Sequence, residues 1–340
     1  MENDDYTSKV LAWLDTEGYP LEFRTAHEFK TAGFEVLQGE YLGRGDGSAP
    51  REVDVTAFKS ILDREHLVRV HHLIECKVSR NKPWVVFTSP KRLSSAACAA
   101  QSIGSDLGRA ALWAIAGSPD LASMSLFTSP TRSGFNGRQA TLSGHRREEP
   151  EAATGDQLSR KSAAGEQQSK KSNVDHFYNS MQSVTSLATL LAREYDHEER
   201  PALELPFACI AVFPVVVVDG RLFESWYDGA AGNMLVEERQ HIRIHWRGAA
   251  AWHHHATIDI VAADFMKDFA RARSSEVSCL LTLMARARDQ IAECFASRSL
   301  DPLEVFPGGR GVLGLPPLLR AIPNAEDASD EDLDSDVDGE

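Results

Sequence analysis

The chain has 340 residues, 42% of them hydrophobic, which is enough to bury a sizeable core and excludes a disordered protein. No apolar run approaches the roughly 18 residues that cross a bilayer, and the acidic, polar start lacks the basic and apolar segments of a secretory signal. Five scattered cysteines without CxxC spacing favour free thiols in a reducing cytoplasm over disulfides or a zinc ribbon. The sequence therefore predicts a cytoplasmic globular protein.

Most of the net charge of −14 lies in one segment. The run from Asn324 to Glu340 has nine acidic residues and no basic ones, with few apolar residues between them. Such a composition cannot supply a core, so we expect 324–340 to be a disordered acidic tail. The net charge of the whole chain therefore says little about the surface of its folded part.

The first 80 residues are expected to form two helices followed by strands. Residues 6–17 have the composition of a short helix. A second helix is expected to begin at Pro20 and to end at Gly33, because proline suits a first helical turn and glycine the position after a helix end. Strand-like runs follow at 34–43, 51–58 and 66–78. The turn-rich segment GRGDGSAP joins the first two into a hairpin, so the sequence predicts an α-β-β-β order.

The middle of the chain changes character twice. Residues 94–116 are alanine-rich, have apolar residues at helical spacing and predict one helix that ends at Gly117. Between 129 and 173, bulky apolar residues are scarce among serine, glycine and charged residues, which predicts a flexible insertion. Its basic residues either contact phosphate groups or keep a linker solvated. A further amphipathic helix is expected from 174 to about 197.

The C-terminal half begins with a strongly apolar strand. FACIAVFPVVVV (207–218) is a continuous run rich in β-branched residues, typical of a strand buried on both faces. Asp219-Gly220 is expected to turn it into a hairpin with RLFESWYD. The remaining expected elements are strands at 241–246 and 255–262 and helices at 263–273 and 276–297.

Helices that alternate with strands place the chain in the α/β or α+β class, with a central mixed sheet flanked by helices. We expect a core in two parts, with extra strands and helices in the C-terminal region. The predicted divisions are the first part of the core (1–128), the flexible insertion (129–173), the rest of the core with its C-terminal α/β decoration (174–300) and the acidic tail (324–340).

Charged residues at alternating positions of two predicted strands indicate a metal site. In REVDVTAF, Asp54 points away from the face of its apolar neighbours, and in HLIECKV, Glu75 and Lys77 share one face. If these strands are neighbours, two carboxylates and an ammonium meet between apolar strands, which is costly unless a hard cation such as Mg²⁺ is bound. The candidate ligands are Asp54, Glu75 and the backbone carbonyl of Cys76, and Mn²⁺ is expected to substitute. Glu22, on the inward-packing face of its helix, adds a carboxylate.

These residue types suit the hydrolysis of a phosphodiester. The reaction needs an activated water and neutralisation of the negative charge that develops in the transition state, and a metal ion supplies both. Lys77 is expected to orient or deprotonate the attacking water. The predicted catalytic set is therefore Glu22, Asp54, Glu75 and Lys77. Surface charges on an ordinary antiparallel sheet are the alternative interpretation.

The order of these motifs resembles the PD-(D/E)XK nuclease superfamily, especially its Mrr-like and restriction-endonuclease-like branches. The resemblance rests on PLEFRTAHEFKTAGFEVLQGEYL, followed by REVDVTAF and LIECKVS, and covers about 70 residues. Asp54, Glu75 and Lys77 match the D and ExK positions, and Glu22 matches the accessory helix glutamate. The chain departs from the name-giving pattern at Val53, where a proline would stand. The region beyond Leu205 resembles no domain that we can name.

The resemblance implies a restriction-endonuclease-like core and a Mg²⁺-dependent endonuclease that cuts DNA in restriction or phage defence. One alternative is a nuclease that cleaves RNA or structured junctions, since the chemistry is shared and RNA recognition depends on contacts to the 2′-OH. Another is a non-catalytic subunit that binds nucleic acid or a partner protein on a nuclease scaffold. The expected partners are nucleic acid, a second copy of the chain or a defence-system protein, and no membrane.

Several residues outside the motifs are candidates for substrate contacts. Arg80, Lys82 and Trp84 follow the third strand and form a predicted rim, in which the indole either stacks on a base or packs in the core. Related nucleases carry a glutamine on the helix after ExK. Gln101 and Gln182 are the candidates for this role, or are plain helix-surface residues, and the stronger amphipathicity of its helix favours Gln182.

A histidine cluster and the acidic tail have competing interpretations. Three consecutive histidines (253–255) cannot all chelate one ion from a strand, and neither they nor the nearby His241 and His245 have HxxxH or cysteine partners. Their alternatives are phosphate contacts, turn positions or no special role. The tail (324–340) is either a solubilising segment or a polyanion that competes with DNA for the basic groove of the protein.

Overall fold

The computed structural model describes residues 2–43, 49–63, 66–80, 82–128, 131–139, 176–196, 208–246, 256–303 and 315–322. Within these ranges, the strands are β1 (Glu35–Leu42), β2 (Arg51–Asp63), β3 (His66–Val78), β4 (Trp84–Arg92), β5 (Ile103–Gly104), β6 (Thr131–Gln139), β7 (Ala208–Asp219), β8 (Leu222–Asp228), β9 (Asn233–Glu238), β10 (His241–Trp246) and β11 (Ala256–Ala262). The helices are α1 (Glu2–Glu17), α2 (Tyr19–Thr31), α3 (Ser95–Ala100), α4 (Asp106–Ile115), α5 (Pro119–Ser123), α6 (Ser125–Thr128), α7 (His176–Glu194), the 3-10 turn η1 (Ala263–Phe265), α8 (Met266–Ser297) and α9 (Pro317–Arg320).

The predicted α-β-β-β start is confirmed. Gly18 has a left-handed backbone (φ 91°) that separates α1 from α2, and Pro20 lies in the first turn of α2. β1, β2 and β3 then pair as an antiparallel meander, with Val36 opposite Ala57 and Val55 opposite Ile74. This meander forms one end of the sheet.

The described strands form one mixed sheet, in the order β1-β2-β3-β7-β11-β10-β6-β4-β8-β9, with β5 attached to β7. β7 lies parallel to β3 on one side and to β11 on the other. As predicted from its apolar run, β7 is buried along almost its whole length. Strands from before and after the predicted insertion therefore belong to the same sheet, which confirms an α/β architecture with a central mixed sheet.

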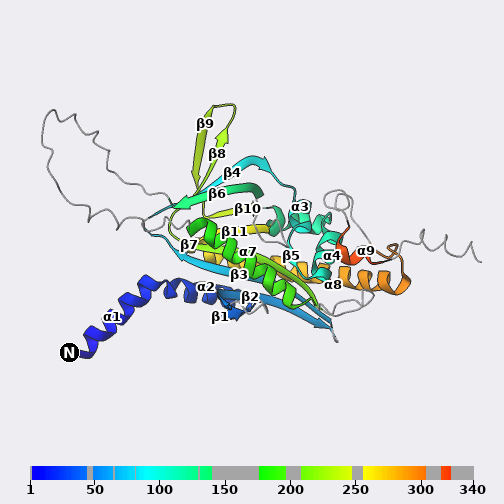
Figure 1. The fold of residues 1–340 in the computed structure, drawn as a ribbon, viewed down its shortest axis with the longest axis horizontal. Coiled ribbons are helices and arrows are strands. Elements are labelled where there is room, and N and C mark those ends of the chain that lie inside the picture. Colours follow the sequence, from blue (N-terminus) through cyan, green and yellow to red (C-terminus); the bar gives the residue numbers. More distant parts are fainter. Residues whose placement is uncertain are drawn as a thin grey trace, which may run out of the picture.

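Helices cover both faces of the sheet (Figure 1). Phe177, Met181 and Val184 of α7 form a core on one face with residues such as Leu73 and Val216. The other face carries a larger core, to which α2, α4 and α8 contribute. α1 extends away from this body, at the blue end of the ribbon in Figure 1. The end of β3 that carries Glu75 and Lys77 is thus approached by helices from both faces.

Part of the predicted flexible insertion is a strand. Residues 131–139 form β6, which pairs with β4 and β10, whereas 140–173 lies outside the described residues. β6 has glycine at two positions where neighbouring side chains need the space. A Cβ at Gly137 would overlap the ring of Phe177, and one at Gly134 would press on Ile244.

Three further expectations from the sequence are wrong in detail. The helix expected at 94–116 is broken into α3 and α4, since Ser105 caps Gly108 N–H and also hydrogen-bonds to Ala208 and Ile210 of β7. β7 and β8 do not form a hairpin, because β8 pairs with β4 and β9. The two helices expected at 263–297 are one 3-10 turn and one continuous helix, α8.

Further features of the described ranges concern the helices and the cysteines. None of the helices in the described ranges is long and apolar enough to cross a membrane. The five cysteines, all within those ranges, are free thiols, as their scattered spacing predicted. The acidic tail lies outside the described residues.

Candidate active site

Asp54 lies at a fork between two strands. The β2–β3 ladder runs from Asp63 opposite His66 to Val55 opposite Ile74. At the next position, the Asp54 carboxylate takes the place of a backbone acceptor, and its Oδ2 accepts a hydrogen bond from the N–H of Cys76 at 2.7 Å. The side chain of Asp54 is thereby fixed beside the backbone of β3.

Glu75 and Lys77 meet on β3, one residue on either side of Cys76. Lys77 Nζ lies 2.5 Å from Glu75 Oε1, and Ser183 of α7 donates a long hydrogen bond to Glu75 Oε2 at 3.5 Å. Burial alone would lower the pKa of Lys77, but the charge of Glu75 and the hydrogen bond to it raise the pKa above the usual value. Lys77 is therefore a protonated ammonium at neutral pH in this arrangement.

An excess of carboxylates surrounds this single ammonium. Burial, followed by the charges of Asp54 and Glu52, raises the pKa of Glu22 to about 7. Burial and the charge of Glu75 raise the pKa of Asp54 to about 6. Since the neighbouring carboxylates disfavour the ionisation of Glu22 and of Asp54, the cluster favours the arrival of a further positive charge.

The donor chemistry of the cluster fits a hard divalent cation. Asp54, Glu75 and the Cys76 carbonyl are the oxygen donors that would hold it, with Glu22 nearby. Within the described ranges, no three His, Cys, Asp or Glu side chains already converge on one point as a preformed metal cage. Glu75 would therefore have to turn part of its carboxylate from Lys77 toward the ion.

The three residues of the predicted rim, Arg80, Lys82 and Trp84, lie in different environments. Trp84 is fully buried and its ring contacts Phe177, so it packs in the core and does not offer a stacking surface. Lys82 is exposed. Arg80 donates a hydrogen bond to Asp219 at 2.8 Å and two hydrogen bonds to Asp15 at 2.9 and 3.1 Å. It therefore joins the segment after β3 to the end of β7 and to α1.

The structure distinguishes between the two glutamines by their helices. α7, which carries Gln182, packs on β3 and β7 and places Ser183 next to Glu75. Gln182 itself donates to Ser186 within the same helix at 3.3 Å. Gln101 follows α3, which packs on α4, α5 and α6. α7 is therefore the helix that contacts Glu75, through Ser183, and the role of Gln182 stays a prediction.

Of the histidine candidates, His241 and His245 lie within the described residues. His253, His254 and His255 lie outside the described residues. His241 Nε2 lies 2.7 Å from Asp259 Oδ1, in a buried network in which Arg243 also holds Asp259 through two short hydrogen bonds. His241 thus has a structural partner within the core.

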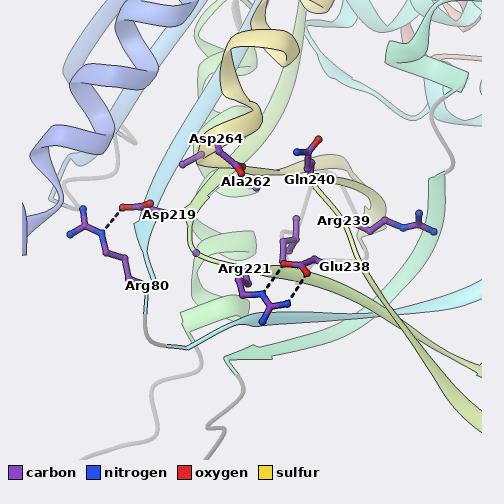
Figure 2. Close-up of a pocket in the computed structure, with 11 residues that line it drawn as sticks. Arg80, Asp219, Arg221, Glu238, Arg239, Gln240, Ala262 and Asp264 are labelled. Atoms are coloured by element: carbon purple, nitrogen blue, oxygen red, sulfur yellow. Dashed lines mark hydrogen bonds and ion pairs between the residues drawn. The ribbon is translucent and has the colours of Figure 1, made fainter.

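Sequence reasoning missed several groups around the site. Ser183 approaches it only through tertiary packing, whereas Glu52 lies two residues before Asp54 on β2 and shares its face. A pocket of about 570 Å³ also opens at the ends of β7 and β11 (Figure 2). Its charged lining consists of Arg80, Arg221, Arg239, Asp219, Glu238 and Asp264. Figure 2 shows two of its arginines held by carboxylates, Arg80 by Asp219 and Arg221 by Glu238.

This pocket is linked to the candidate site through Asp219. Asp219 is the last residue of β7 and pairs with Val78, next to Lys77. Its carboxylate also lies 3.9 Å from Arg24 of α2, two residues after Glu22. The pocket and the carboxylate cluster therefore lie at the same end of the parallel strands β3 and β7.

No protein-family model, curated protein or solved structure matched this chain. The geometry of the cluster is therefore the basis for a functional assignment.

Proposed function

We propose that this protein is a metal-dependent nuclease of the PD-(D/E)XK type, with a restriction-endonuclease-like core, that hydrolyses phosphodiester bonds in DNA. The observation that carries the proposal is the convergence of Asp54, Glu75 and Lys77 at the fork between β2 and β3. An ordinary sheet surface would not gather three or more carboxylates around one ammonium at such an electrostatic cost.

The fold supports the proposal at the level of local architecture. An accessory helix, α2, precedes the three-stranded meander, and Glu22 of that helix is coupled electrostatically to Asp54 and Glu75. These elements occur in the order on which the sequence resemblance rests. Because active sites are where perturbed carboxylates gather, the raised pKa values of Glu22 and Asp54 support a functional rather than a structural role.

Each residue has a defined task in the proposed hydrolysis. When bound, a divalent ion would supply charge neutralisation and acidify a water molecule. Asp54 and Glu75 present carboxylate oxygens for that ion, and the Cys76 N–H fixes the orientation of Asp54. Lys77, as an ammonium, orients the water and balances the negative charge on the phosphate. Release of Glu75 from Lys77 would leave the ammonium available for the substrate.

The proposal is tested by incubating purified protein with plasmid, linear duplex, single-stranded DNA and RNA, in Mg²⁺, Mn²⁺ or EDTA. Cleavage of at least one substrate is expected in either metal and none in EDTA. Lys77→Ala should lower the rate by at least a hundredfold, because it removes a group that acts on the reacting atoms. Lys267→Ala, which changes an exposed lysine of α8, is the matched control and should cut at the wild-type rate.

The outcomes separate the proposed activity from its alternatives. Selective cleavage of RNA would keep the site and change the substrate. Metal-independent binding of nucleic acid without any cleavage would instead favour a non-catalytic subunit on the same scaffold. A Lys77→Ala variant that cuts as fast as the wild type would remove β3 from the catalytic machinery. Restriction or phage defence is the setting that we propose for a DNA-cutting activity.

A further inference from the structure

Several aromatic side chains are exposed on the first two helices and on the edge strand β1. Trp13 of α1, Tyr19 and Phe23 of α2 and Tyr41 of β1 are 52%, 39%, 63% and 64% exposed. The rings of Trp13 and Tyr19 are 5.8 Å apart, and the charge of Glu52, with a smaller contribution from Tyr19, raises the pKa of Tyr41. We call these four residues the aromatic face. Single exposed aromatics are ordinary, but a group of them marks a binding surface.

The aromatic face adjoins the carboxylate cluster. On α2, Glu22 lies between Tyr19 and Phe23, within one helical turn. On the sheet, Tyr41 is the cross-strand partner of Glu52 and hydrogen-bonds to it. Glu52 in turn acts electrostatically on Glu22 and Asp54. A strand of nucleic acid that reaches Asp54 would therefore pass these rings.

Cationic groups lie close to the same residues. Asp15, two residues after Trp13, is held by Arg80, and Arg24 follows Phe23 directly. Both arginines approach Asp219 at the end of β7. Aromatic rings next to arginines form the combination that binds single strands, because bases stack on the rings while the guanidinium groups attract phosphates.

We propose that the aromatic face stacks on unpaired bases, so that the substrate of the site is single-stranded nucleic acid or a duplex with a single-stranded segment. The inference rests on the proposed nuclease function and specifies its substrate class. The bases of an intact duplex stack on each other and expose only their edges in the grooves. The rings of the aromatic face would therefore gain little stacking energy from a duplex, whereas each unpaired base offers a π-face on which a ring can stack.

Binding is measured first, on the full-length Lys77→Ala variant in EDTA, so that cleavage does not interfere. The probes are a 20-nucleotide thymidine oligomer and a 20-base-pair duplex, and the signal is the tryptophan fluorescence of the chain, to which Trp13 is one of six contributors. We expect the single strand to quench this fluorescence and to bind at least tenfold more tightly than the duplex. The Phe23→Ala and Phe23→Leu changes should each weaken single-strand binding by roughly tenfold.

The leucine variant separates stacking from simple apolar contact, since it retains a large apolar side chain without a π-system. Tyr227→Ala is the matched control, because Tyr227 is a 57% exposed aromatic on β8, and it should bind like its parent. Cleavage of blunt duplex, forked duplex and single strand by the otherwise wild-type protein is compared next. Phe23→Ala should slow cleavage of the forked and single-stranded substrates.

The results distinguish this inference from the proposed function. Efficient cleavage of blunt duplex that is unaffected by Phe23→Ala would overturn the inference and leave the nuclease intact. Ring-dependent binding of single strands without cleavage of any substrate would retain the inference and remove the nuclease activity. If Phe23→Ala instead converts a dimer into a monomer in sedimentation experiments and leaves single-strand binding unchanged, the face binds a second copy of the chain and the inference is wrong.

Discussion

The carboxylate of Asp54 accepts the backbone N–H of Cys76 at 2.7 Å, at the position where β2 and β3 stop pairing. The side chain thus continues the hydrogen bonding of the ladder while the two backbones separate. This contact places Asp54 next to Glu75, and the Cys76 N–H and Lys77 offset only part of the cost of ionising Asp54 there. The repulsion between Asp54 and Glu75 should lower the stability of the metal-free protein, which can be measured without a substrate.

Replacing Asp54 by asparagine should stabilise the metal-free protein at pH 8. Burial and the charge of Glu75 raise the pKa of Asp54 from 3.8 to about 6, so the folded state disfavours its ionised form. Asparagine removes the charge and retains an oxygen that accepts the Cys76 N–H. Urea denaturation in EDTA should show a gain on the order of 2 kcal/mol.

The stability gained by Asp54→Asn should be larger at high pH than at low pH. The pKa of Asp54 is higher in the folded state than in the unfolded state, so the folded state holds this proton more tightly. The wild type is therefore most stable below pH 3.8 and loses this stability as the pH rises through about 6. The difference between Asp54→Asn and the wild type should therefore shrink as the pH falls from 8 toward 4. A variant that is less stable than the wild type at pH 8 would show that the hydrogen bond outweighs the repulsion.

Divalent cations should raise the melting temperature of the wild type. An ion that binds only the folded state adds about 2.7 kcal/mol at a hundred times its dissociation constant. Asp54→Asn and Glu75→Gln should each lose most of the shift seen with Mn²⁺, because each removes one charged ligand. Glu293→Gln, which alters an exposed glutamate of α8, should keep the full shift. Equal shifts in all four proteins would place the ion elsewhere.

Gly137→Ala should destabilise the fold by about 1–3 kcal/mol. The added methyl group would overlap the ring of Phe177, which forces α7 to move away from β6. Gly229→Ala is the matched control, since a Cβ added at Gly229 has no neighbouring atom of the described residues within 4 Å. Thermal unfolding of both variants measures the difference. Equal melting temperatures would mean that β6 does not lie against α7.

Removal of the acidic tail should tighten nucleic-acid binding at low salt. We expect the nine carboxylates between Asn324 and Glu340 to compete with phosphates for groups such as Arg80 and Lys82, because a tethered competitor has a high effective concentration. A chain that ends at Ile322 should therefore bind DNA more tightly in 20–50 mM salt. The difference should fade as ionic strength rises. Binding curves that coincide across the salt series would reduce the tail to a solubilising segment.

The sequence predicted the first elements well because their signals are local. Gly33 ends a helix, GRGDGSAP joins two alternating strands, and the alternation in HLIECKV puts Glu75 and Lys77 on one side. The contact between Lys77 and Glu75 follows directly from that periodicity. By contrast, the fork at Asp54 depends on where β2 and β3 stop pairing, which periodicity does not reveal.

Features that depend on distant packing could not be predicted. β6 has glycine where Phe177 and Ile244 approach, so its strand pattern is hidden in a polar segment. The Asp219-Gly220 dipeptide has the composition of a hairpin turn. It instead leads into β8 at another part of the sheet, and a Cβ at Gly220 would press on the backbone of Ser79. Trp84 looked like a rim residue because its burial depends on α7.

The position of β3 between β2 and β7 has a consequence for the synthesis of the protein. One neighbour is local, but residues 208–219 form the other, and they leave the ribosome long after Glu75 and Lys77. Until then β3 presents an unpaired edge, and pairing across so long a separation is slow. A nascent or prematurely terminated chain therefore has the residues of the site but lacks β7, which pairs with β3, and Ser183 of α7, which contacts Glu75. If the protein cuts DNA, we expect incomplete copies to be inactive.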